Sequence, residues 1–403
     1  MANVSSSNGL EKRPKLRFPG FDEPYKQCRI GDIYAERSQR GASDMELLSV
    51  TMNDGVMPRS EIEGKDNSSE DKSNYKVVLT GDMVYNSMRM WQGANGISPC
   101  DGIVSPAYTV LMPKIPISNG YFAALFKSPN LINEFRKNSQ GMTSDTWNLK
   151  YPQIETIKVC IPALSEQNRV ADMLRTLERR IAKQAQLVDN LKKYKRGLLS
   201  REFGQQENGD LNNRYVGKLK DYFHLSSGST PSSTNRAFYS GNIRWVSSGE
   251  LKPKYLCETS QHISSEAVSS CNLREYPANT LLVAMYGLEA AGVRGTASIL
   301  SVPATISQAC MAIQQTGEID IEYLYYWYIY NGQWIGIRIA QGTKQQNLST
   351  DTLGNLRIHA PSCSKQKKVC KLLSQIDYLI EKEGQKIDLL SSAKRGLLQQ
   401  LFI

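Results

Sequence analysis

Several short polar segments carry side chains that can hydrogen-bond to the edges of nucleic-acid bases. Arg and Lys match the acceptors of guanine, Asn and Gln match adenine, and small hydroxyls fit either base. In the first half of the chain these residues are Arg37, Gln39, Arg40, Asn86, Arg89, Gln92 and Thr143. In the second half they are Ser229, Thr230, Ser248, Gln341, Thr343, Lys344, Gln345 and Asn347. The sequence predicts base contacts for these residues, and ordinary polar surface is the alternative for any single segment.

Motifs that would support catalysis are absent from the sequence. It contains no phosphate-binding P-loop, no H-E-x-x-H helix, no G-x-S-x-G elbow and no glycine-rich turn for S-adenosylmethionine. The histidines His224, His262 and His359 have no cysteine or carboxylate at ligand or triad spacing. The eight cysteines form no C-x-x-C pair. We therefore expect reduced thiols, no catalytic residue, no metal and no cofactor bound by this chain.

The length and charge set the broad class of protein. A chain of 403 residues suits two domains with connectors, and a net charge of +10 favours a polyanionic partner. No apolar run reaches the roughly 18 residues of a membrane span. The first residues are polar and lack the apolar stretch of a secretion signal. We expect a cytoplasmic protein with a flexible leader over residues 1–20 and no membrane partner.

An internal duplication organises the elements that must position the polar segments. The segment Pro162–Phe203 aligns without a gap with Pro361–Phe402, at an offset of 199 residues. Both copies begin with Pro, carry Ser three residues later, and end in Lys-Arg-Gly-Leu-Leu followed by Phe. Self-similarity over such a length indicates that one structural unit occurs twice.

Both copies have the apolar spacing of a long helix that pairs with another helix. Ser165 and Ser364 stand where N-caps are expected, and about 35 residues of helix would span roughly 50 Å. This is too long for a helix inside one small domain, so we predict an antiparallel coiled coil. The predicted pairing residues are Val170, Leu174, Leu177, Ile181, Gln184, Val188, Leu191 and Leu198, with Val369, Leu373, Ile376, Ile380, Glu383, Ile387, Leu390 and Leu397.

Polar residues interrupt the apolar stripe at matching places in both helices. Gln184 and Glu383 occupy one such position, where they would face each other in an antiparallel pair, and Lys195 and Lys394 occupy another. A polar layer can fix the register of two helices at some cost in stability. Alternatively, these side chains extend out of the seam toward water.

Weaker similarities extend the duplication into the rest of the chain. Arg29–Ile33 resembles Lys218–Tyr222, and Gln140-Gly141 resembles Gln341-Gly342. Strand-like runs occur at Tyr75–Leu79, Met83–Tyr85, Thr109–Met112, Leu281–Met285 and Cys310–Ile313, and helical patterns at Tyr121–Lys127, Leu131–Lys137 and Ile321–Trp334. The fold class is therefore mixed α/β (α+β). The predicted divisions are residues 1–20 (leader), 21–160 (first globular half), 161–203 (central helix), 204–214 (linker), 215–359 (second globular half) and 360–403 (C-terminal helix).

Nine of the ten excess positive charges lie in 161–203 and 361–403, the two helical segments. Such an excess can be a solvated helix face. It can also follow DNA phosphates or dock an acidic surface of a partner.

Taken together, these segments resemble the specificity subunits of type I restriction–modification systems. The resemblance covers nearly the whole chain. It is carried by Pro14–Phe21, by Gly228–Ser232 leading to Gly241–Val246, by Gln341–Leu348, and by Pro162-x-x-x-Glu166-Gln167 before a helix that ends in Lys195–Leu199. Two features depart from the family pattern. Lys365 stands where a Glu is usual, and the first half lacks the Gly-x-Thr-Pro-Ser element.

The resemblance implies a function for each part of the chain. Each globular half would be a target recognition domain that reads one part of a split, asymmetric site in double-stranded DNA. The paired helices would set the spacing between the two parts and hold two methyltransferase subunits, which use S-adenosylmethionine to methylate adenine. Motor and endonuclease subunits can join such a complex. This chain would itself be non-catalytic.

Two other functions remain open from the sequence. The chain could be a fused or self-sufficient enzyme, although that function needs a catalytic motif. It could also be a scaffold in which the same duplication binds protein or RNA in place of DNA.

Overall fold

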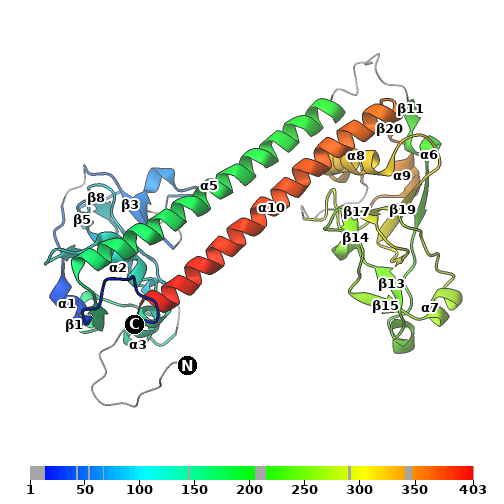
Figure 1. Cartoon of the computed structure of the whole chain (residues 1–403). Helices are drawn as coiled ribbons and strands as arrows, with labels where there is room; N and C mark the ends of the chain where they lie inside the picture. Colours follow the sequence, from blue (N-terminus) through cyan, green and yellow to red (C-terminus); the bar gives the residue numbers. More distant parts are fainter. Residues whose placement is uncertain are drawn as a thin grey trace. The chain divides into compact units, whose positions relative to one another are not determined.

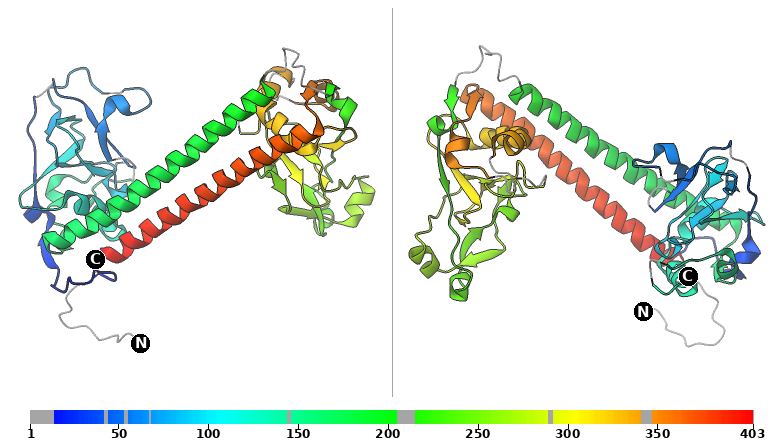
Figure 2. Two further views of the ribbon diagram at one scale, coloured as in Figure 1. Left: turned by 45° about the horizontal axis from the view of Figure 1, so that its top comes forward. Right: turned by 180° about the vertical axis from the view of Figure 1, so that it is seen from behind.

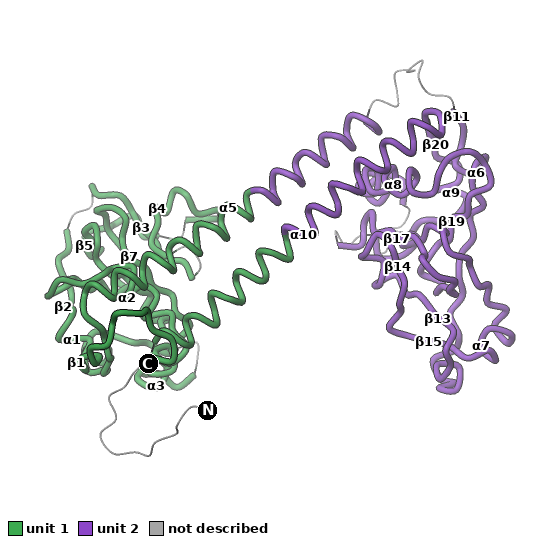
Figure 3. Tube along the Cα trace, viewed as in Figure 1, with its two compact units in different colours: residues 1–186, 384–403 green, residues 187–383 purple. Residues whose placement is uncertain are grey.

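The computed structural model describes residues 14–41, 44–52, 55–66, 68–143, 146–204, 215–288, 292–340 and 347–402. The chain divides into two compact units, residues 1–186 with 384–403 (unit 1) and residues 187–383 (unit 2), which Figure 3 colours separately. The border passes through both long helices, so each unit holds a globular half, part of α5 (Leu164–Phe203) and part of α10 (Cys363–Leu401). Each unit therefore contains the same kinds of structural element, as the predicted duplication requires.

Unit 1 combines a small antiparallel sheet with short helices (Figure 1). Its strands are β1 (Lys26–Arg29), β2 (Tyr34–Glu36), β3 (Leu48–Thr51), β4 (Gly55–Pro58), β5 (Lys76–Val78), β6 (Met83–Asn86), β7 (Asn95–Ile97), β8 (Gly102–Val104), β9 (Tyr108–Pro113) and β10 (Lys158–Ile161). Its short helices are α1 (Ile30–Ile33), η1 (Arg59–Glu61), η2 (Met90–Gln92), α2 (Asn119–Leu125), α3 (Pro129–Asn138) and α4 (Tyr151–Ile154). The central sheet has the order β2-β9-β6-β7.

Unit 2 repeats this arrangement, and its α8 (14 residues) is longer than α2 of unit 1 (7 residues). Its strands are β11 (Tyr215–Lys218), β12 (Phe223–Ser227), β13 (Ile243–Val246), β14 (Tyr255–Leu256), β15 (Gln261–Ile263), β16 (Leu281–Ala284), β17 (Ala297–Leu300), β18 (Thr305–Ile306), β19 (Cys310–Gln315) and β20 (Arg357–Ala360). Its short helices are α6 (Leu219–Tyr222), η3 (Arg236–Tyr239), η4 (Ser248–Glu250), α7 (Ser265–Ser270), α8 (Ile321–Trp334), η5 (Ile335–Ile339) and α9 (Thr350–Gly354). The larger sheet has the order β12-β19-β16-β17-β14.

Equivalent strands and hydrogen bonds form the same frame in both units. The triplet β2-β9-β6 corresponds to β12-β19-β16, and the pair β1-β10 corresponds to β11-β20. The N–H of Leu149 donates to the Ser87 carbonyl at 2.9 Å, and the N–H of Leu348 donates to the Met285 carbonyl at 2.8 Å. The mixed α/β fold with an internal duplication, two globular halves and two long helices is therefore confirmed, and each predicted strand and short helix overlaps an observed one.

The ends of the long helices belong to the hydrophobic cores of the globular halves. In unit 1 the fully buried ring of Tyr121 in α2 contacts Phe402, the residue after α10, with 5.3 Å between ring centroids. In unit 2 Tyr323 in α8 contacts Phe203 of α5 at 5.1 Å. The Phe that follows each repeated Lys-Arg-Gly-Leu-Leu is thus an anchor in a domain core, because burying a large aromatic side chain is strongly favourable.

Within each unit the two long helices run side by side and antiparallel (Figures 1 and 2). In unit 1 Lys394 makes an ion pair with Glu178 at 2.7 Å, and in unit 2 Lys195 makes one with Asp377 at 2.5 Å. These pairs are equivalent under the 199-residue offset. The polar seam positions Lys195 and Lys394 therefore join the helices by ion pairs.

The other predicted pairing residues are buried or half-buried, and none is exposed. Gln184 belongs to unit 1 and Glu383 to unit 2, so their pairing stays a prediction.

Two local predictions differ from the structure. The helices begin before Ser165 and Ser364, because the N–H of Gln167 bonds to the carbonyl of Ala163 and that of Gln366 bonds to the carbonyl of Ser362. The predicted caps were thus two residues late, since a hydroxyl next to an apolar repeat marks a helix start only approximately.

Among the described helices none is long and apolar enough to cross a membrane.

The part of the predicted flexible leader that the structure describes is bound to unit 1. The Leu16 N–H donates to the carbonyl of Gln400 at 3.0 Å, and the Arg17 guanidinium bonds both oxygens of Glu166 at 2.9 Å. Polar composition alone suggested a loose segment, but the buried Glu166 carboxylate needs a cation, and Arg17 supplies it.

Candidate nucleic-acid interface

In unit 1 the predicted base-reading segments come together at one end of the central sheet. Strand β9 runs antiparallel to both β2 and β6, so the carboxyl ends of β2 and β6 lie beside the start of β9. Hydrogen bonds fix the loops there, from the Arg37 N–H to the Val110 carbonyl (2.9 Å) and from the Ser87 N–H to the Ala107 carbonyl (3.4 Å). The backbone thus gathers three segments that are distant in sequence, 37–40, 86–92 and the described residues of 140–149.

Arg37 has a partner inside unit 1, and its base contact stays a prediction. Its Nε and Nη2 atoms donate to the two oxygens of Asp82 at 2.6 and 3.1 Å, and its side chain is 17% exposed. The hydrogen bond to Asp82 raises the pKa of the Arg37 guanidinium. Because these two donors are used inside the fold, Arg37 positions the loop after β2.

The other predicted residues of unit 1 are more accessible. Gln39, Arg40 and Thr143 are exposed, whereas Asn86, Arg89 and Gln92 are half-buried. Arg40 donates to Asn74 at 3.4 Å, and Asn86 accepts a hydrogen bond from the Met88 N–H at 3.0 Å. These residues lie on the gathered loops, and their contacts with bases stay a prediction.

Sequence reasoning missed an aromatic and basic cluster at this edge of unit 1. The rings of Trp91 and Trp147 meet edge to face at 5.3 Å, and the Arg136 guanidinium lies 5.5 Å from the Trp147 ring centroid. The three residues come from η2, from the segment before Leu149, and from α3. The Trp91 beside Arg89 in the sequence was a possible signal, but nothing local indicated that Trp147 would join it.

In unit 2 the equivalent sheet end carries Ser229, Thr230 and Ser248. The Ser229 N–H donates to the Ile306 carbonyl at 3.1 Å, and the Thr230 hydroxyl accepts from the Gln308 N–H at 3.2 Å. Ser248 is half-buried in η4. The strand pairs β12-β19 and β16-β19 place the first two at the same sheet end as Met285, on the opposite side of β19.

The carboxylate of Glu250 holds the 247–250 turn, because it accepts hydrogen bonds from Ser247 and Ser260. Burial alone would raise the pKa of Glu250, but these hydrogen bonds outweigh it, and the pKa is lowered.

The last predicted segment is only partly visible. Gln341, Thr343, Lys344 and Gln345 lie outside the described residues, whereas Asn347 is described and exposed. The Leu348 N–H, bonded to Met285, fixes the end of this segment at the same sheet end as Ser229.

Comparison with known proteins identifies the pattern that both units share. The family model of the type I restriction modification DNA specificity domain matches twice, over residues 23–193 and 213–391. This chain belongs to that family. Each specificity domain consists of one globular half with most of its following long helix.

Individual relatives agree with the family match. The type I restriction enzyme MjaIX specificity subunit of Methanocaldococcus jannaschii is 29% identical over 192 residues, which is 47% of this chain and 43% of that relative. The matched part is thus less than half the length of that relative. The MjaVIII specificity subunit of the same organism is 23% identical over 365 residues, covering 82% of this chain and 81% of the relative.

A solved structure shares the fold. The crystal structure of the type I restriction-modification system S subunit from M. genitalium superposes with a TM-score of 0.60 at 14% identity, over 97% of this chain and 99% of that one. At this identity the likeness concerns the fold alone.

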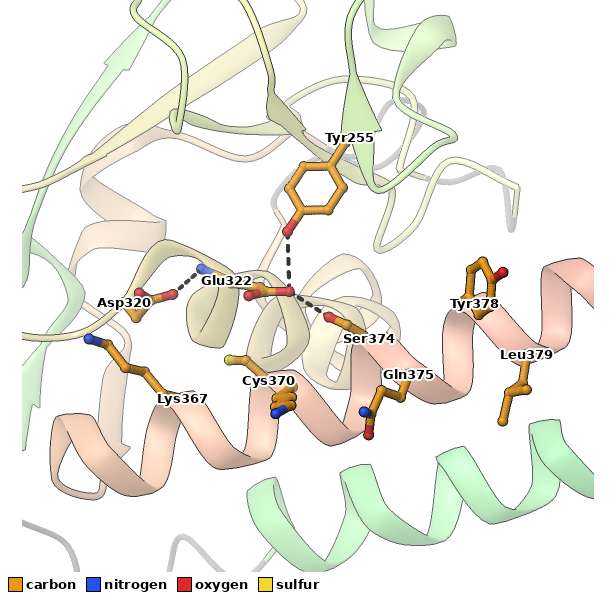
Figure 4. A pocket seen from close by; sticks show the side chains of 10 residues that line it. Tyr255, Asp320, Glu322, Lys367, Cys370, Ser374, Gln375, Tyr378 and Leu379 are labelled. Carbon is orange, nitrogen blue, oxygen red and sulfur yellow. Dashed lines mark hydrogen bonds between the residues drawn. The ribbon is translucent and has the colours of Figure 1, made fainter.

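A groove on the second specificity domain contains a group of possible metal ligands (Figure 4). The ligand atoms of Asp320, Glu322 and Cys370 lie within 4.8 Å of one another. However, Glu322 accepts hydrogen bonds from Lys254, from Ser374 (2.6 Å) and from Tyr255 (3.2 Å). Burial raises the pKa of the Cys370 thiol, which disfavours the thiolate that binds metals. These contacts favour an ion-pair network over a metal centre.

Proposed function

We propose that this chain is the DNA specificity subunit of a type I restriction–modification complex. Its two specificity domains would read the two parts of a split, asymmetric site in double-stranded DNA. The observation that carries the proposal is one backbone frame, present twice, that gathers different polar loops at the same end of its sheet. Equal frames with unequal loops suit two different half-sites.

The paired helices would set the distance between the half-sites. They contain 40 and 39 residues, and helices of this size are about 60 Å long at 1.5 Å per residue. One duplex turn is about 34 Å, so a stretch of DNA between the half-sites would remain unread.

The same helices would hold methyltransferase subunits, two per chain, and motor or endonuclease subunits could join them. Exposed lysines and arginines cover much of both helices, which suits an acidic partner surface. The chain itself would be non-catalytic and act in the cytoplasm. S-adenosylmethionine would bind to the methyltransferase subunits.

The test is to produce the chain together with the methyltransferase of the same system and to map methylated adenines genome-wide. We expect a stable complex and one split methylated motif, which disappears when this chain is deleted. The proposal fails if no methyltransferase binds the chain and its deletion changes no methylation. Methylation by the pure chain with added S-adenosylmethionine would instead indicate a self-sufficient enzyme.

A second experiment tests the role of the helices as a spacer. One helical turn is inserted after both Gln184 and Glu383, so that the equivalent positions of both copies shift together. We expect a longer unread spacer with unchanged half-sites. Changed half-sites with an unchanged spacer would contradict this role.

A further inference from the structure

The segment 140–143 of the first specificity domain presents an apolar side chain to solvent. The Met142 side chain is 100% exposed. The turn is closed by two hydrogen bonds between Gln140 and Asn148, at 3.0 and 2.8 Å, and by the bond from the Thr146 N–H to the Thr143 carbonyl at 3.0 Å. Hydrogen bonds among the described residues on both sides of Met142 therefore hold the backbone that exposes it.

Gly141 makes this turn possible. Its φ of +148° is unfavourable for other residues, and an added Cβ would lie 2.6 Å from the Thr146 carbonyl oxygen. The backbone bends sharply at Gly141, so Met142 comes directly after the bend.

The turn is continuous with the candidate nucleic-acid interface. The bond from the Leu149 N–H to the Ser87 carbonyl attaches its end to the loop that carries Asn86 and Arg89. At its base, Trp147 packs on Trp91, and the exposed Arg136 lies over the Trp147 ring. The Trp147 ring thus holds a cation at this edge, where a phosphate could pair with it.

We propose that Met142 is a wedge that deforms DNA: its side chain enters the base stack at one step of the first half-site, and Arg136 binds a neighbouring phosphate. This rests on the proposed function. Proteins that kink DNA insert apolar side chains, Met among them, between base pairs, and the cost of unstacking is offset by wider contact. Sequence steps that unstack easily would then be favoured without a direct base contact.

The experiment uses the complex of the full chain with its methyltransferase and a duplex with the mapped site. We expect Met142→Ala to raise the Kd on the order of ten-fold, the effect of losing one buried apolar side chain, and Met142→Leu to bind nearly normally. Duplexes with one mismatched pair, moved through the first half-site, should restore the affinity of Met142→Ala at one position, because a mismatch already weakens stacking. Ile115→Ala is the matched control, an exposed apolar residue beyond the other end of β9.

Arg136→Gln tests the phosphate contact. It should lower the slope of log Kd against log salt by about one, without changing the preferred sequence.

The outcomes separate the wedge from the proposed function. If the unmodified complex shows no sequence preference, the proposed function fails. If it binds its site and Met142→Ala binds equally well, the wedge is overturned and the proposed function stands. A loss of affinity that no mismatch restores would place Met142 on the groove surface outside the stack, which also overturns the wedge.

Discussion

In both units one helix of the globular half packs against the long helices, and the side chains at this contact differ. The N-caps of α2 and α8 are Ser118 and Asp320, so equivalent positions in these helices are 202 residues apart. Ala124 of unit 1 therefore corresponds to Tyr326 of unit 2, and Gly120 corresponds to Glu322.

Unit 1 has a groove at this contact. It is lined by small and charged residues that include Gly120, Ala123, Ala124, Ala171 and Arg175. The start of α5 is held by the N-terminal segment, because Arg17 of that segment bonds to Glu166.

Unit 2 also has a groove at the equivalent place, and the Glu322 and Ser374 side chains that line it belong to a network of charged and aromatic side chains. Lys254 bonds Glu322, the Tyr326 hydroxyl (2.9 Å) and the Ser374 hydroxyl (2.6 Å). The Tyr326 hydroxyl then donates to Asp377 at 2.8 Å, and Asp377 pairs with Lys195 of α5. At the start of α10, Lys365 replaces the Glu of unit 1. The duplication thus kept the backbone frame while each copy acquired its own attachment to the helices.

Removing the central ring of the unit 2 network should have the largest effect. Tyr326 is fully buried, and Tyr326→Ala would open a cavity and leave Asp377 and Lys254 with fewer partners. We expect a loss of about 3–5 kcal/mol in the free energy of unfolding, seen as faster hydrogen exchange in unit 2. The exposed Tyr378→Ala is the control and should change stability by less than about 0.5 kcal/mol. Unchanged exchange in unit 2 would show that the network does not hold this domain to the helices.

Breaking the ion pair between Arg17 and Glu166, the clamp on unit 1, should have the second largest effect on stability. Arg17→Met leaves the Glu166 carboxylate, which is 1% exposed, without its cation, and we expect a loss of about 3 kcal/mol confined to unit 1. The double variant with Glu166→Met should recover most of this loss, because no charge is then left buried. Lys365→Ala, at the equivalent position of α10, should be silent. Equal effects of Arg17→Met in both units would contradict a local clamp.

Both units share one contact, and the stability lost on removing it is the reference for the Tyr326 and Arg17 variants. The Gln167 side chain accepts from the Ser118 N–H (3.1 Å) and donates to the Pro162 carbonyl (2.9 Å). Gln366 makes the same bonds with Asp320 and Pro361, both at 2.9 Å. Gln167→Leu and Gln366→Leu should each cost about 2 kcal/mol, since buried polar groups lose their partners. A large inequality between the two, measured by hydrogen exchange in each unit, would show that the shared frame is not equally important in both copies.

The sequence predicts the parts of this molecule that repeat or alternate locally. Period and offset identified both long helices, and alternation identified strands such as Met83–Tyr85, because these patterns depend on neighbours within a few residues. The mixed fold and its two halves followed from the same signals. The residue types of the polar segments suggested base contacts, which stay a prediction.

The contacts that distinguish the two units were not predictable in this way. Lys254 and Ser374 are 120 residues apart, and Arg17 and Glu166 are 149 apart, so no local pattern joins them. For the same reason the sequence does not predict the ion pair of Arg37, since its partner Asp82 reaches it only through the pairing of β2, β9 and β6. Which polar residue is buried depends on the tertiary fold, and composition does not reveal it.

The smallest expected effect is a pH dependence that belongs to unit 2. Burial alone would raise the pKa of Glu322, but hydrogen bonds from Lys254 and Ser374 and the charge of Lys254 outweigh it, so the pKa is lowered. A lowered folded-state pKa gives stability that is present above the unfolded value, near 4.3, and is lost as the pH falls through the folded value. Glu322→Gln should thus be about 1 kcal/mol less stable than the unmodified chain at pH 7, and this difference should shrink below about pH 4.

Glu258→Gln is the matched control for this pH dependence, because Glu258 pairs with Arg244 while 72% exposed, and its removal should have little effect at any pH. A stability difference between Glu322→Gln and the unmodified chain that stays constant from pH 7 to pH 3.5 would mean that the ionised carboxylate does not hold the network. The attachment of the second domain to the helices would then depend on the packing of Tyr326. The two units would differ at this contact only in the size of the side chain, Ala124 in unit 1 and Tyr326 in unit 2.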